Sequence, residues 1–370
     1  MFDKKISAIL ILAALFGSDM AIVADAADAA DAPSAPLSAA DRSDIIATLG
    51  SELKTKYVFP DVADHVVAQL AAKSAHGDYA AAGTTTEFAV MLTHDLREFG
   101  KDAHFRVSYR PDFHPHADDD APPSAEELEK QRAMTVQWGY GVARVERLPG
   151  NVGYIDLRGF GETEFVQAAY TQAMALLAGT DAMIIDLRRN GGGDPDSVAY
   201  FMSQFFAPGD ERHLNDIYNR PKNTTREYWT NPAAGPRYTK PLYVLTSPRT
   251  FSGGEECAYD FQTQKRATLI GEVTGGGANP GQGVALGHGL VAFVPTGRAI
   301  NPITHTNWEH VGVTPDVEVP AKQAYFTAYA TILRALLPKA ANPNEKEEIE
   351  RALGGAEKGE DEQVDYSRMH

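Results

Sequence analysis

The amino-acid sequence predicts an α/β fold with a small helical domain on its N-terminal side. Three observations lead to this prediction. Residues 38–99 repeat apolar side chains at helical spacing, apolar strand-like runs alternate with amphipathic runs from Gly139 onward, and glycine-rich stretches follow two of the strand-like runs. Such alternation is typical of a layered domain in which helices cover a largely parallel sheet.

The composition is that of a globular protein. Of the 370 residues, 43% are hydrophobic and 23% are charged, and a chain of this length is expected to form two domains. Acidic residues outnumber basic ones by 50 to 34, which gives a formal net charge of −16. This charge disfavours nucleic acid or an anionic membrane as a partner. Neither the composition nor the charge predicts an oligomeric state.

Residues 1–26 resemble a secretory signal peptide. Two lysines precede an apolar run at residues 6–16, and small residues around Ala26 suit a cleavage site. The run is shorter than the roughly 20 residues that span a bilayer, so we expect cleavage and no stable membrane span in the mature form. The expected location is periplasmic or extracellular. Residues 27–37 are expected to be a disordered leader, because they are low in complexity.

The N-terminal helical domain is expected over residues 38–110. Its helical spacing is clearest in one set of apolar residues, namely Ile45, Ile46, Leu49 and Leu53. Residues 111–136 follow as an expected linker or loop, because proline, histidine and aspartate occur early in this stretch without periodicity.

The α/β core domain is expected over residues 137–338. Its clearest strands are expected at residues 153–158, 182–187, 241–246 and 267–271. Its helices are expected at residues 164–177, 197–206 and 253–265. Residues 339–370 are strongly charged, and a polar tail is expected there.

The sequence predicts neither a cofactor nor a metal centre. His114, His116 and Asp118 are close together but lack the fixed spacing of a metal site. The nucleotide-binding and dinucleotide-binding fingerprints are absent. Cys257 is the single cysteine, so no intramolecular disulfide can form, and its apolar neighbours predict a buried, inert side chain.

A run of three glycines ends the strand-like stretch at residues 186–193. Consecutive glycines suit a sharp turn whose amide groups point outward, which is a geometry that binds anions. A phosphate cradle is less suitable, since no lysine followed by serine or threonine completes the nucleotide-loop pattern. The stretch is therefore interpreted as an oxyanion-binding turn.

Ser252 lies between an expected strand and an expected helix, and two glycines follow it. A serine at a helix N-terminus is favoured as an alkoxide by the helix dipole, and the glycines let an amide approach a developing oxyanion. The alternative is a structural N-cap, because Glu255 stands three residues later as in a capping box. This motif by itself does not decide between the two.

Four motifs in order resemble the tail-specific (C-terminal-processing) serine protease family. They lie at residues 186–193, 250–255, 266–277 and 307–316, within a resemblance that covers roughly residues 40 to 330. The most similar branch contains the interphotoreceptor retinoid-binding protein repeats and the tricorn protease core. The resemblance implies a crotonase/Clp-protease-like β-β-α core. It also implies Ser252 as nucleophile, with amides of the glycine loop around Gly192 and of Gly253 as oxyanion hole.

The general base separates two branches of this family, one with a serine–lysine dyad and one with a histidine. Lys265 is 13 positions after Ser252 on the same expected helix, which places it about 20 Å away. Lysine is therefore disfavoured. Among the histidines, His104 resembles the family's Asp-x-His motif. Its alternative interpretation is a histidine at a strand start that bonds a backbone carbonyl.

Ser252 and His104 are expected to meet across the domain boundary. Glu309 resembles the fourth member of the tricorn-type tetrad, and the alternative is a surface carboxylate in a loop. Tricorn-like members carry a serine immediately before the histidine, whereas this chain has Ala103. Either Asp102 or Glu309 could therefore orient the imidazole.

The sequence as a whole predicts an exported serine-type peptidase that acts on a peptide or protein substrate. About 50 residues separate His104 from Tyr154, too few for a PDZ insertion of roughly 90 residues. The alternative is a non-catalytic carrier of retinoid-like or other hydrophobic ligands, and a third possibility is a hydrolase of small esters or amides. A carrier would not need the serine, the histidine and the glycines together.

Overall fold

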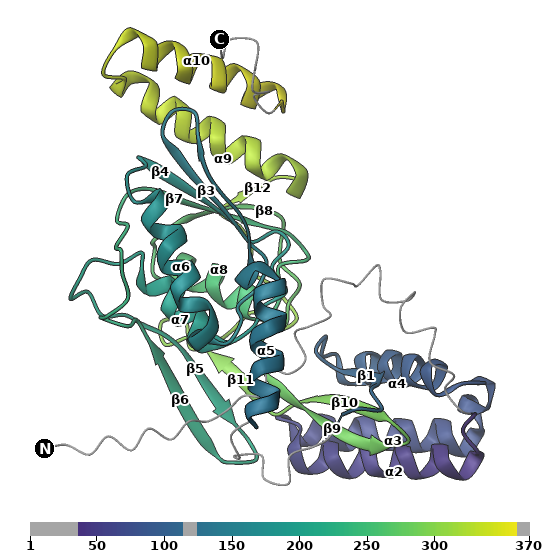
Figure 1. Ribbon diagram of the computed structural model, residues 1–370. Helices are drawn as coiled ribbons and strands as arrows, with labels where there is room; N and C mark the ends of the chain where they lie inside the picture. The colour runs from purple at the N-terminus through teal and green to yellow at the C-terminus, as the bar shows by residue number, and fades with distance from the viewer. Residues whose placement is uncertain (1–35, 114–123, 361–370) are drawn as a thin grey trace, which may run out of the picture. The chain divides into compact units, whose positions relative to one another are not determined.

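The computed structural model describes residues 36–113 and 124–360 (Figure 1). The expected signal peptide, most of the leader, and His114, His116 and Asp118 lie outside these residues. The chain divides into two compact units. Of the described residues, the helical unit combines those up to Met134 with Asn215–Glu227 and Gly277–His310. The sheet unit contains Thr135–Leu214, Tyr228–Gly276 and the described residues from Val311 onward.

The helical unit begins with the helices that the apolar spacing predicts. They are α2 (Ala39–Lys56), α3 (Pro60–His76), the short 3-10 helix η2 (Asp78–Ala81) and α4 (Thr85–Gly100). Ser38 with Asp41 and Thr84 with Glu87 form capping boxes that start α2 and α4. The helical N-terminal region is thus confirmed.

Segments from much later in the chain complete the core of the helical unit. The antiparallel strands β1 (Arg106–Tyr109), β10 (Leu290–Pro295) and β9 (Gly281–Gly287) form one sheet. Their buried Val107, Ala292 and Val294 belong to the same hydrophobic cluster as Leu49 and Leu70 of the helices. A second three-stranded sheet has the order β11 (Gly297–Ile300), β5 (His213–Asn219) and β6 (Thr224–Trp229). The unit therefore extends beyond the contiguous domain expected at residues 38–110.

The sheet unit contains a six-stranded mixed sheet in the order β12-β8-β7-β4-β3-β2. Its strands are β2 (Val142–Leu148), β3 (Val152–Leu157), β4 (Ala182–Asp186), β7 (Leu242–Thr246), β8 (Thr268–Gly271) and β12 (Val317–Glu318). All neighbours are parallel except β2 and β3. The α/β class and the largely parallel sheet are as predicted, while the crotonase-like topology remains a prediction.

Helices lie on both sides of this sheet, as Figure 1 shows. The helices α6 (Thr163–Leu177), α7 (Pro195–Ser203) and α8 (Gly253–Thr263) lie on one side. The other side carries α9 (Ala321–Leu336), whose Ala324, Ala328 and Leu333 pack in one cluster with buried sheet residues. The short 3-10 helices η3 (Gly139–Gly141) and η4 (Leu337–Lys339) precede β2 and follow α9.

Two segments that were expected to be irregular contain helices. Helix α5 (Ala125–Gln137) lies in the expected linker, and α10 (Pro343–Lys358) lies in the expected polar tail. Ile349, Ala352 and Ala356 are buried in the cluster that α9 forms with the sheet. Their spacing of three and four residues is helical, but charged neighbours obscure it in the sequence. Among the described residues, no helix is both long and apolar enough to cross a bilayer.

Candidate active site

Ser252 occupies the turn between β7 and α8 in the sheet unit. The strand ends at Thr246 and the helix begins at Gly253, directly after the serine. Ser252 has φ 52° and ψ −123°, and a positive φ is unfavourable for a residue that carries a Cβ atom. Strained turns of this kind present a serine hydroxyl at a helix N-terminus, where the dipole favours negative charge.

The glycine loop lies directly against this turn. A methyl group added to Gly192 would be 2.8 Å from the amide nitrogen of Gly253 and 2.8 Å from Cβ of Ser252. A methyl group on Gly193 would be 1.8 Å from the carbonyl oxygen of Phe160. Both glycines have positive φ, at 102° and 142°. The structure thus brings Gly192, Ser252 and Gly253 together, and side chains larger than hydrogen are excluded at the two loop positions.

Two amide groups of this region are available to bind an anion. The amide of Gly192 donates to Oδ1 of Asn190 at 2.9 Å. The amides of Gly193 and Gly253 make no hydrogen bond within the described part of the chain, and a methyl group on Gly253 would be 3.0 Å from the nitrogen of Gly193. The three-glycine run predicts an anion-binding loop, but only the backbone path shows which of its amides is available.

Glu255 fixes the backbone on both sides of Ser252. Its Oε2 accepts the amide of Ser252 at 2.9 Å, and its Oε1 accepts the Thr274 hydroxyl at 2.5 Å and the Gly276 amide at 2.6 Å. The side chain is fully buried. The contact to Ser252 is one half of the capping box that the sequence permits. Glu255 therefore helps to cap the N-terminus of α8. This role does not exclude a reactive hydroxyl.

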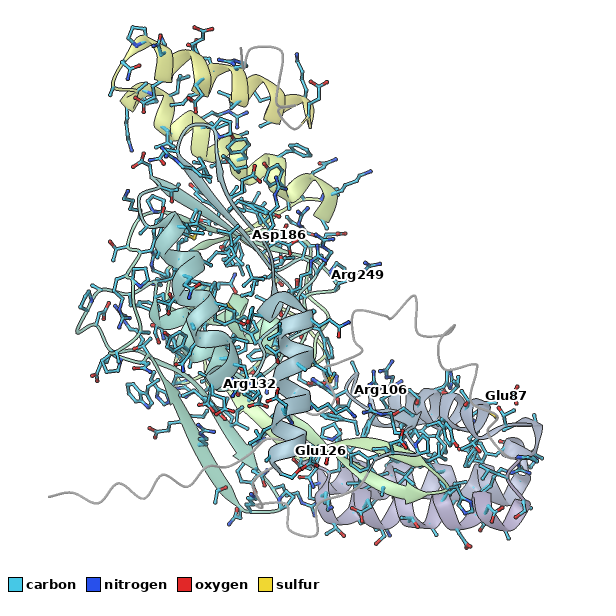
Figure 2. All side chains as sticks on the ribbon, viewed as in Figure 1. Glu87, Arg106, Glu126, Arg132, Asp186 and Arg249 are labelled. Atoms are coloured by element: carbon cyan, nitrogen blue, oxygen red, sulfur yellow. The ribbon has the colours of Figure 1, made fainter. Side chains whose placement is uncertain are left out.

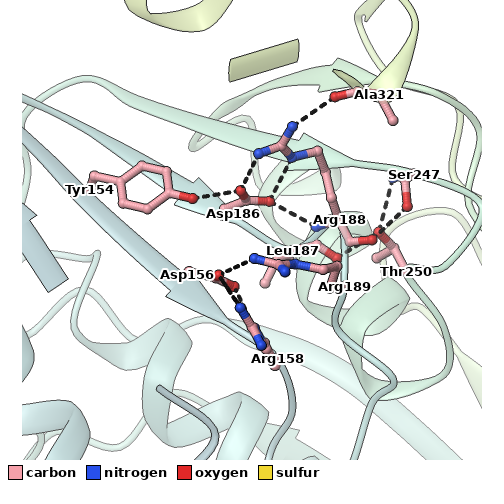
Figure 3. A network of polar contacts seen from close by, with 10 residues as sticks. All are labelled: Tyr154, Asp156, Arg158, Asp186, Leu187, Arg188, Arg189, Ser247, Thr250 and Ala321. Carbon is pink, nitrogen blue, oxygen red and sulfur yellow. Dashed lines mark hydrogen bonds and ion pairs between the residues drawn. The ribbon is translucent and has the colours of Figure 1, made fainter. Parts of the chain in front are cut away.

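A polar network at the carboxyl ends of β3 and β4 supports the glycine loop (Figure 3). Asp156 binds both Arg158 and Arg189, at 3.1 Å and 2.7 Å. Asp186, which ends β4 (Figure 2), binds Arg188 at 2.5 Å and accepts the Tyr154 hydroxyl at 2.7 Å. Each of the two buried carboxylates is thereby paired with at least one guanidinium group, as burial requires.

The turn before Ser252 is attached to the same strand end. The Ser247 hydroxyl donates to the carbonyl of Arg188 at 2.6 Å, and the Thr250 hydroxyl donates to the carbonyl of Leu187 at 2.7 Å. The amide of Phe251 donates to the carbonyl of Asn190 at 2.9 Å. These bonds hold the serine turn and the glycine loop as one rigid substructure.

His104 lies in the helical unit, between α4 and β1. Its backbone amide donates to Oδ1 of Asp102 at 3.0 Å, and the same oxygen is 3.6 Å from Nδ1 of the ring. The ring stacks on Phe293, with ring centroids 6.1 Å apart. Asp102 is fully buried, and its Oδ2 accepts the Tyr57 hydroxyl at 3.3 Å and the Asn279 amide at 2.9 Å.

The protonation of this cluster follows from its contacts. Burial raises the pKa of the Asp102 carboxyl, but the nearby ring and the backbone amide of His104, with the hydrogen bond from Asn279, outweigh it and hold the pKa below its usual value. Burial, followed by the charges of Asp102 and Glu309, raises the pKa of Tyr57. Asp102 is therefore an anion, and Tyr57 is a hydrogen-bond donor to it.

Glu309 lies in the same cluster. Its Oε2 accepts the amide of Ala278 at 2.5 Å. One ligand atom from each of Asp102, His104 and Glu309 lies within 4.8 Å of the other two. Asp102 and Glu309, the two expected partners of His104, therefore both lie close to the imidazole. Glu309 is almost fully buried, unlike an exposed loop carboxylate.

Ser252 and the glycine loop belong to the sheet unit, and His104 and Glu309 belong to the helical unit. The sequence motifs predict Ser252, Gly192, Gly253, His104 and Glu309 as site residues, and this remains a prediction. Sequence reasoning missed the residues that position them, namely Tyr57, Asn190, Glu255 as a hub, Asn279 and Phe293. Tyr57, Asn190, Glu255 and Asn279 share burial of a polar or aromatic side chain, which the sequence does not reveal.

The structure agrees with two further predictions. Cys257 is fully buried in α8, and burial raises the pKa of its thiol well above the usual value, so the thiol is inert. Lys265 follows the C-terminal end of α8, whereas Ser252 precedes its N-terminal end. A lysine at the opposite end of a three-turn helix is out of reach of the serine hydroxyl.

Comparison with known families identifies the chain. Residues 151–319 match peptidase family S41, and residues 38–137 match the N-terminal domain of peptidase S41 in eukaryotic IRBP. The chain belongs to peptidase family S41. The resemblance to tail-specific proteases is confirmed, and the S41 residues include the Ser252 turn, the glycine loop and Glu309.

Similar proteins include two processing enzymes. The chain is 29% identical to carboxyl-terminal-processing peptidase 2 of Arabidopsis thaliana, over 48% of this chain and 35% of that protein. It is 31% identical to the carboxyl-terminal-processing protease of Synechocystis, over 46% of this chain and 39% of that protein. The match thus spans well under half the length of these relatives. A lipoprotein structure from Streptococcus agalactiae shares the fold, with TM-score 0.52, 11% identity, and coverage of 80% of this chain and 96% of that chain.

Proposed function

We propose that this S41 member is an exported serine-type peptidase that hydrolyses peptide bonds through an acyl-enzyme on Ser252. The observation that carries the proposal is the meeting of Gly192, Ser252 and Gly253 at the N-terminus of α8. Two amides there make no other hydrogen bond among the described residues. Membership of a peptidase family supports the same chemistry.

In the first step, Oγ of Ser252 attacks the carbonyl carbon of the scissile peptide bond. His104 accepts the hydroxyl proton and then transfers it to the leaving amine, which departs as the carbon–nitrogen bond breaks. A general base in this role contributes roughly 10²–10⁴ to the rate. In this proposal, Asp102 and Glu309 orient the imidazole and stabilise its protonated form.

The negative oxygen of the tetrahedral intermediate is bound by backbone amides of the glycine loop and of α8. Gly193 and Gly253 supply the donors, while Gly192 provides the space and is itself held by Asn190. Each such donor is worth about 10²–10³ in kcat. The strained backbone of Ser252 keeps the hydroxyl next to these donors.

In the second step, water hydrolyses the acyl-enzyme. His104 takes a proton from the attacking water and returns one to Oγ of Ser252, so the enzyme is regenerated without a cofactor. Hydrolysis of small esters or amides would follow the same path. A hydrophobic-ligand carrier would need neither the strained serine nor the two available amides.

A fluorophosphonate probe tests this function. The wild-type protein should be labelled on Ser252, Ser252→Ala should not be labelled, and His104→Ala should be labelled at least about 100-fold more slowly. His94→Ala is the matched control, because that imidazole is largely exposed and lies in α4. Equal labelling of the wild type and Ser252→Ala, or no labelling of either, would disprove the proposal.

Two finer features belong to the same proposal. The expected signal peptide implies export, so the mature protein should begin close to residue 27 when it is isolated from the periplasm or the medium. The parallel strands that precede each functional turn are consistent with a crotonase/Clp-protease-like core. Recovery of the unprocessed chain from the cytoplasm alone would contradict export.

A further inference from the structure

We propose that Asp102, His104 and Glu309 also form a zinc-binding site, and that zinc bound there reversibly inhibits the peptidase. The inhibition rests on the proposed function, whereas the binding site does not. The three side chains offer one imidazole nitrogen and two carboxylate oxygens, all within 4.8 Å of one another. This donor set suits zinc, which accepts histidine nitrogen and carboxylate oxygen together.

The distances suit coordination. Nδ1 of His104 and Oδ1 of Asp102 are 3.6 Å apart, which is long for a hydrogen bond. Two ligands of a tetrahedral zinc ion, each about 2.1 Å from the metal, are separated by about 3.4 Å. A small closure of the cluster would therefore place both atoms on one ion, with Glu309 as the third ligand.

The two carboxylates are held as metal ligands usually are. Oδ2 of Asp102 accepts from Tyr57 and Asn279, which leaves Oδ1 on the side of His104. Oε2 of Glu309 accepts the amide of Ala278. Consecutive residues, Ala278 and Asn279, thus anchor both carboxylates. Outer contacts of this kind orient ligands and raise metal affinity.

A second anchor fixes this short segment. Nε1 of Trp308, the residue before Glu309, donates to the carbonyl of Gly277 at 2.7 Å. Two hydrogen bonds, one to Glu309 itself and one from Trp308, therefore connect the proposed ligand to residues 277–279. A cluster that is held so firmly loses little entropy when it binds an ion.

The electrostatics also favour a divalent cation. Asp102 is a buried anion, and its only ion-pair partner among the described side chains is His104. Glu309 adds a second carboxylate beside the same ring. A zinc ion bound between the two carboxylates would offset negative charge that burial penalises.

Zinc on Nδ1 would stop the proposed catalysis. A neutral imidazole carries one ring proton, and coordination of Nδ1 forces that proton onto Nε2. A nitrogen that already bears a proton cannot accept another from the hydroxyl of Ser252. Zinc would then inhibit without touching the serine or the oxyanion donors, and a chelator would restore activity.

Isothermal titration of the intact protein with zinc tests the binding site. We expect one zinc ion per chain, at least tenfold weaker binding in His104→Ala and in the nearly isosteric Glu309→Gln, and 10–100-fold weaker binding in Asn279→Ala. Magnesium, which prefers oxygen ligands, should not compete. Undiminished binding in both His104→Ala and Glu309→Gln would overturn the proposal, as would absence of binding at high micromolar zinc.

A second cluster in the helical unit provides the control for zinc binding. His94, Asp95 and Glu98 also bring suitable atoms together, but His94 and Glu98 are largely exposed and Lys73 already pairs with Asp95 at 2.8 Å. His94→Ala should bind zinc within twofold of the wild type. A loss in His94→Ala alone would assign the ion to that cluster and overturn the proposal.

The inhibition is measured as the rate of fluorophosphonate labelling with and without zinc. Labelling should slow at the zinc concentration that saturates the titration, and a chelator should reverse the effect. Ser252→Ala should bind zinc normally while it remains unlabelled. A wild type that is not labelled but binds zinc through His104 would overturn the proposed function and retain the site, whereas normal labelling with no zinc effect would overturn the inhibition.

Discussion

The side-chain amide of Asn279 donates a 2.9 Å hydrogen bond to Oδ2 of Asp102, across 177 positions of sequence. The Tyr57 hydroxyl donates to the same oxygen. With Oδ2 occupied twice, Oδ1 is directed to His104, where it accepts the backbone amide and lies near Nδ1. We therefore propose that Asp102 orients the imidazole, in a chain that has alanine at position 103.

The first prediction compares the two carboxylates. Asp102→Asn should lower kcat at least about 100-fold with little change in KM, because an amide at this position disfavours the tautomer that accepts the serine proton. Glu309→Gln should lower kcat less, since its carboxylate is anchored to the backbone of Ala278. Steady-state kinetics on a peptide substrate measure both effects. A larger loss in Glu309→Gln would reverse the assignment.

Asn279→Ala tests whether the hydrogen bond from Asn279 positions Asp102 for catalysis. It removes one hydrogen bond to a buried carboxylate, which costs about 1–3 kcal/mol in unfolding free energy. A purely structural role would change only stability. We expect in addition a lower kcat at unchanged KM, with partial recovery in Asn279→Gln, whose longer side chain retains the amide donor.

The second prediction concerns the glycine loop. In Gly192→Ala the added methyl group would meet Gly253 N and Cβ of Ser252 at 2.8 Å, so the loop must move and the proposed oxyanion donors should separate. We expect kcat to fall by about 10²–10³ and fluorophosphonate labelling to slow in parallel. Gly179→Ala is the control, since nothing lies within 4 Å of its added methyl group. Full activity in Gly192→Ala would show that the loop is not part of the site.

The sequence alone predicted the position of residues that stand in a clear local pattern. Apolar spacing predicted the helices α2 to α4, and the strand–glycine–helix pattern placed Ser252 and Gly192 at turns. The sequence could not show that residues 277–310 complete the helical unit, because pairing of β10 with β1 is a long-range contact without a local signal.

Positioning residues are hidden for a related reason. Asn279 follows a glycine-rich stretch and has the composition of a turn residue, and only its burial beside Asp102 gives it a role. Tyr57 similarly looks like a core aromatic residue at the end of α2. The function of such side chains depends on the partner, and the partner is remote in sequence.

The third prediction concerns Glu255. Its two oxygens accept from Ser252, Thr274 and Gly276, so Glu255→Gln would place an NH₂ group against at least one donor. We expect a loss of about 1–3 kcal/mol in unfolding free energy together with a lower kcat, because the serine turn loses its anchor. Urea unfolding and steady-state kinetics provide the two readouts. Lower stability with unchanged kcat would show that Glu255 acts only as a helix cap and does not affect catalysis.

The fourth prediction concerns pH. Burial, with the nearby charges of Asp194 and Asp196, raises the pKa of Glu162 from 4.5 to about 8. The native state then holds a proton that the unfolded chain releases, so the unfolding free energy should fall as pH rises from about 4.5 to about 8. Glu162→Gln should flatten this decline in urea titrations. Glu164→Gln, at an exposed neighbour, should leave it unchanged.

Asp194 contributes in the same direction over a lower range. Burial and Asp196 raise its pKa from 3.8 to about 6, despite hydrogen bonds from Thr163. The decline that remains in Glu162→Gln should therefore lie below about pH 6. If Glu162→Gln retained the full decline up to pH 8, Glu162 would not hold the proton.

The fifth prediction tests whether α10 belongs to the folded sheet unit. Ile349 is fully buried in the cluster that includes Ala328 and Leu333 of α9, although charged residues surround it in sequence. Ile349→Ala should lower the unfolding free energy by about 2–5 kcal/mol, because it leaves a cavity between two helices. Glu347→Ala, at an exposed position of the same helix, should change it by less than about 0.5 kcal/mol. Equal effects of the two substitutions in urea unfolding would mean that α10 does not pack on α9 in solution, and that this segment behaves as the polar tail that its composition indicates.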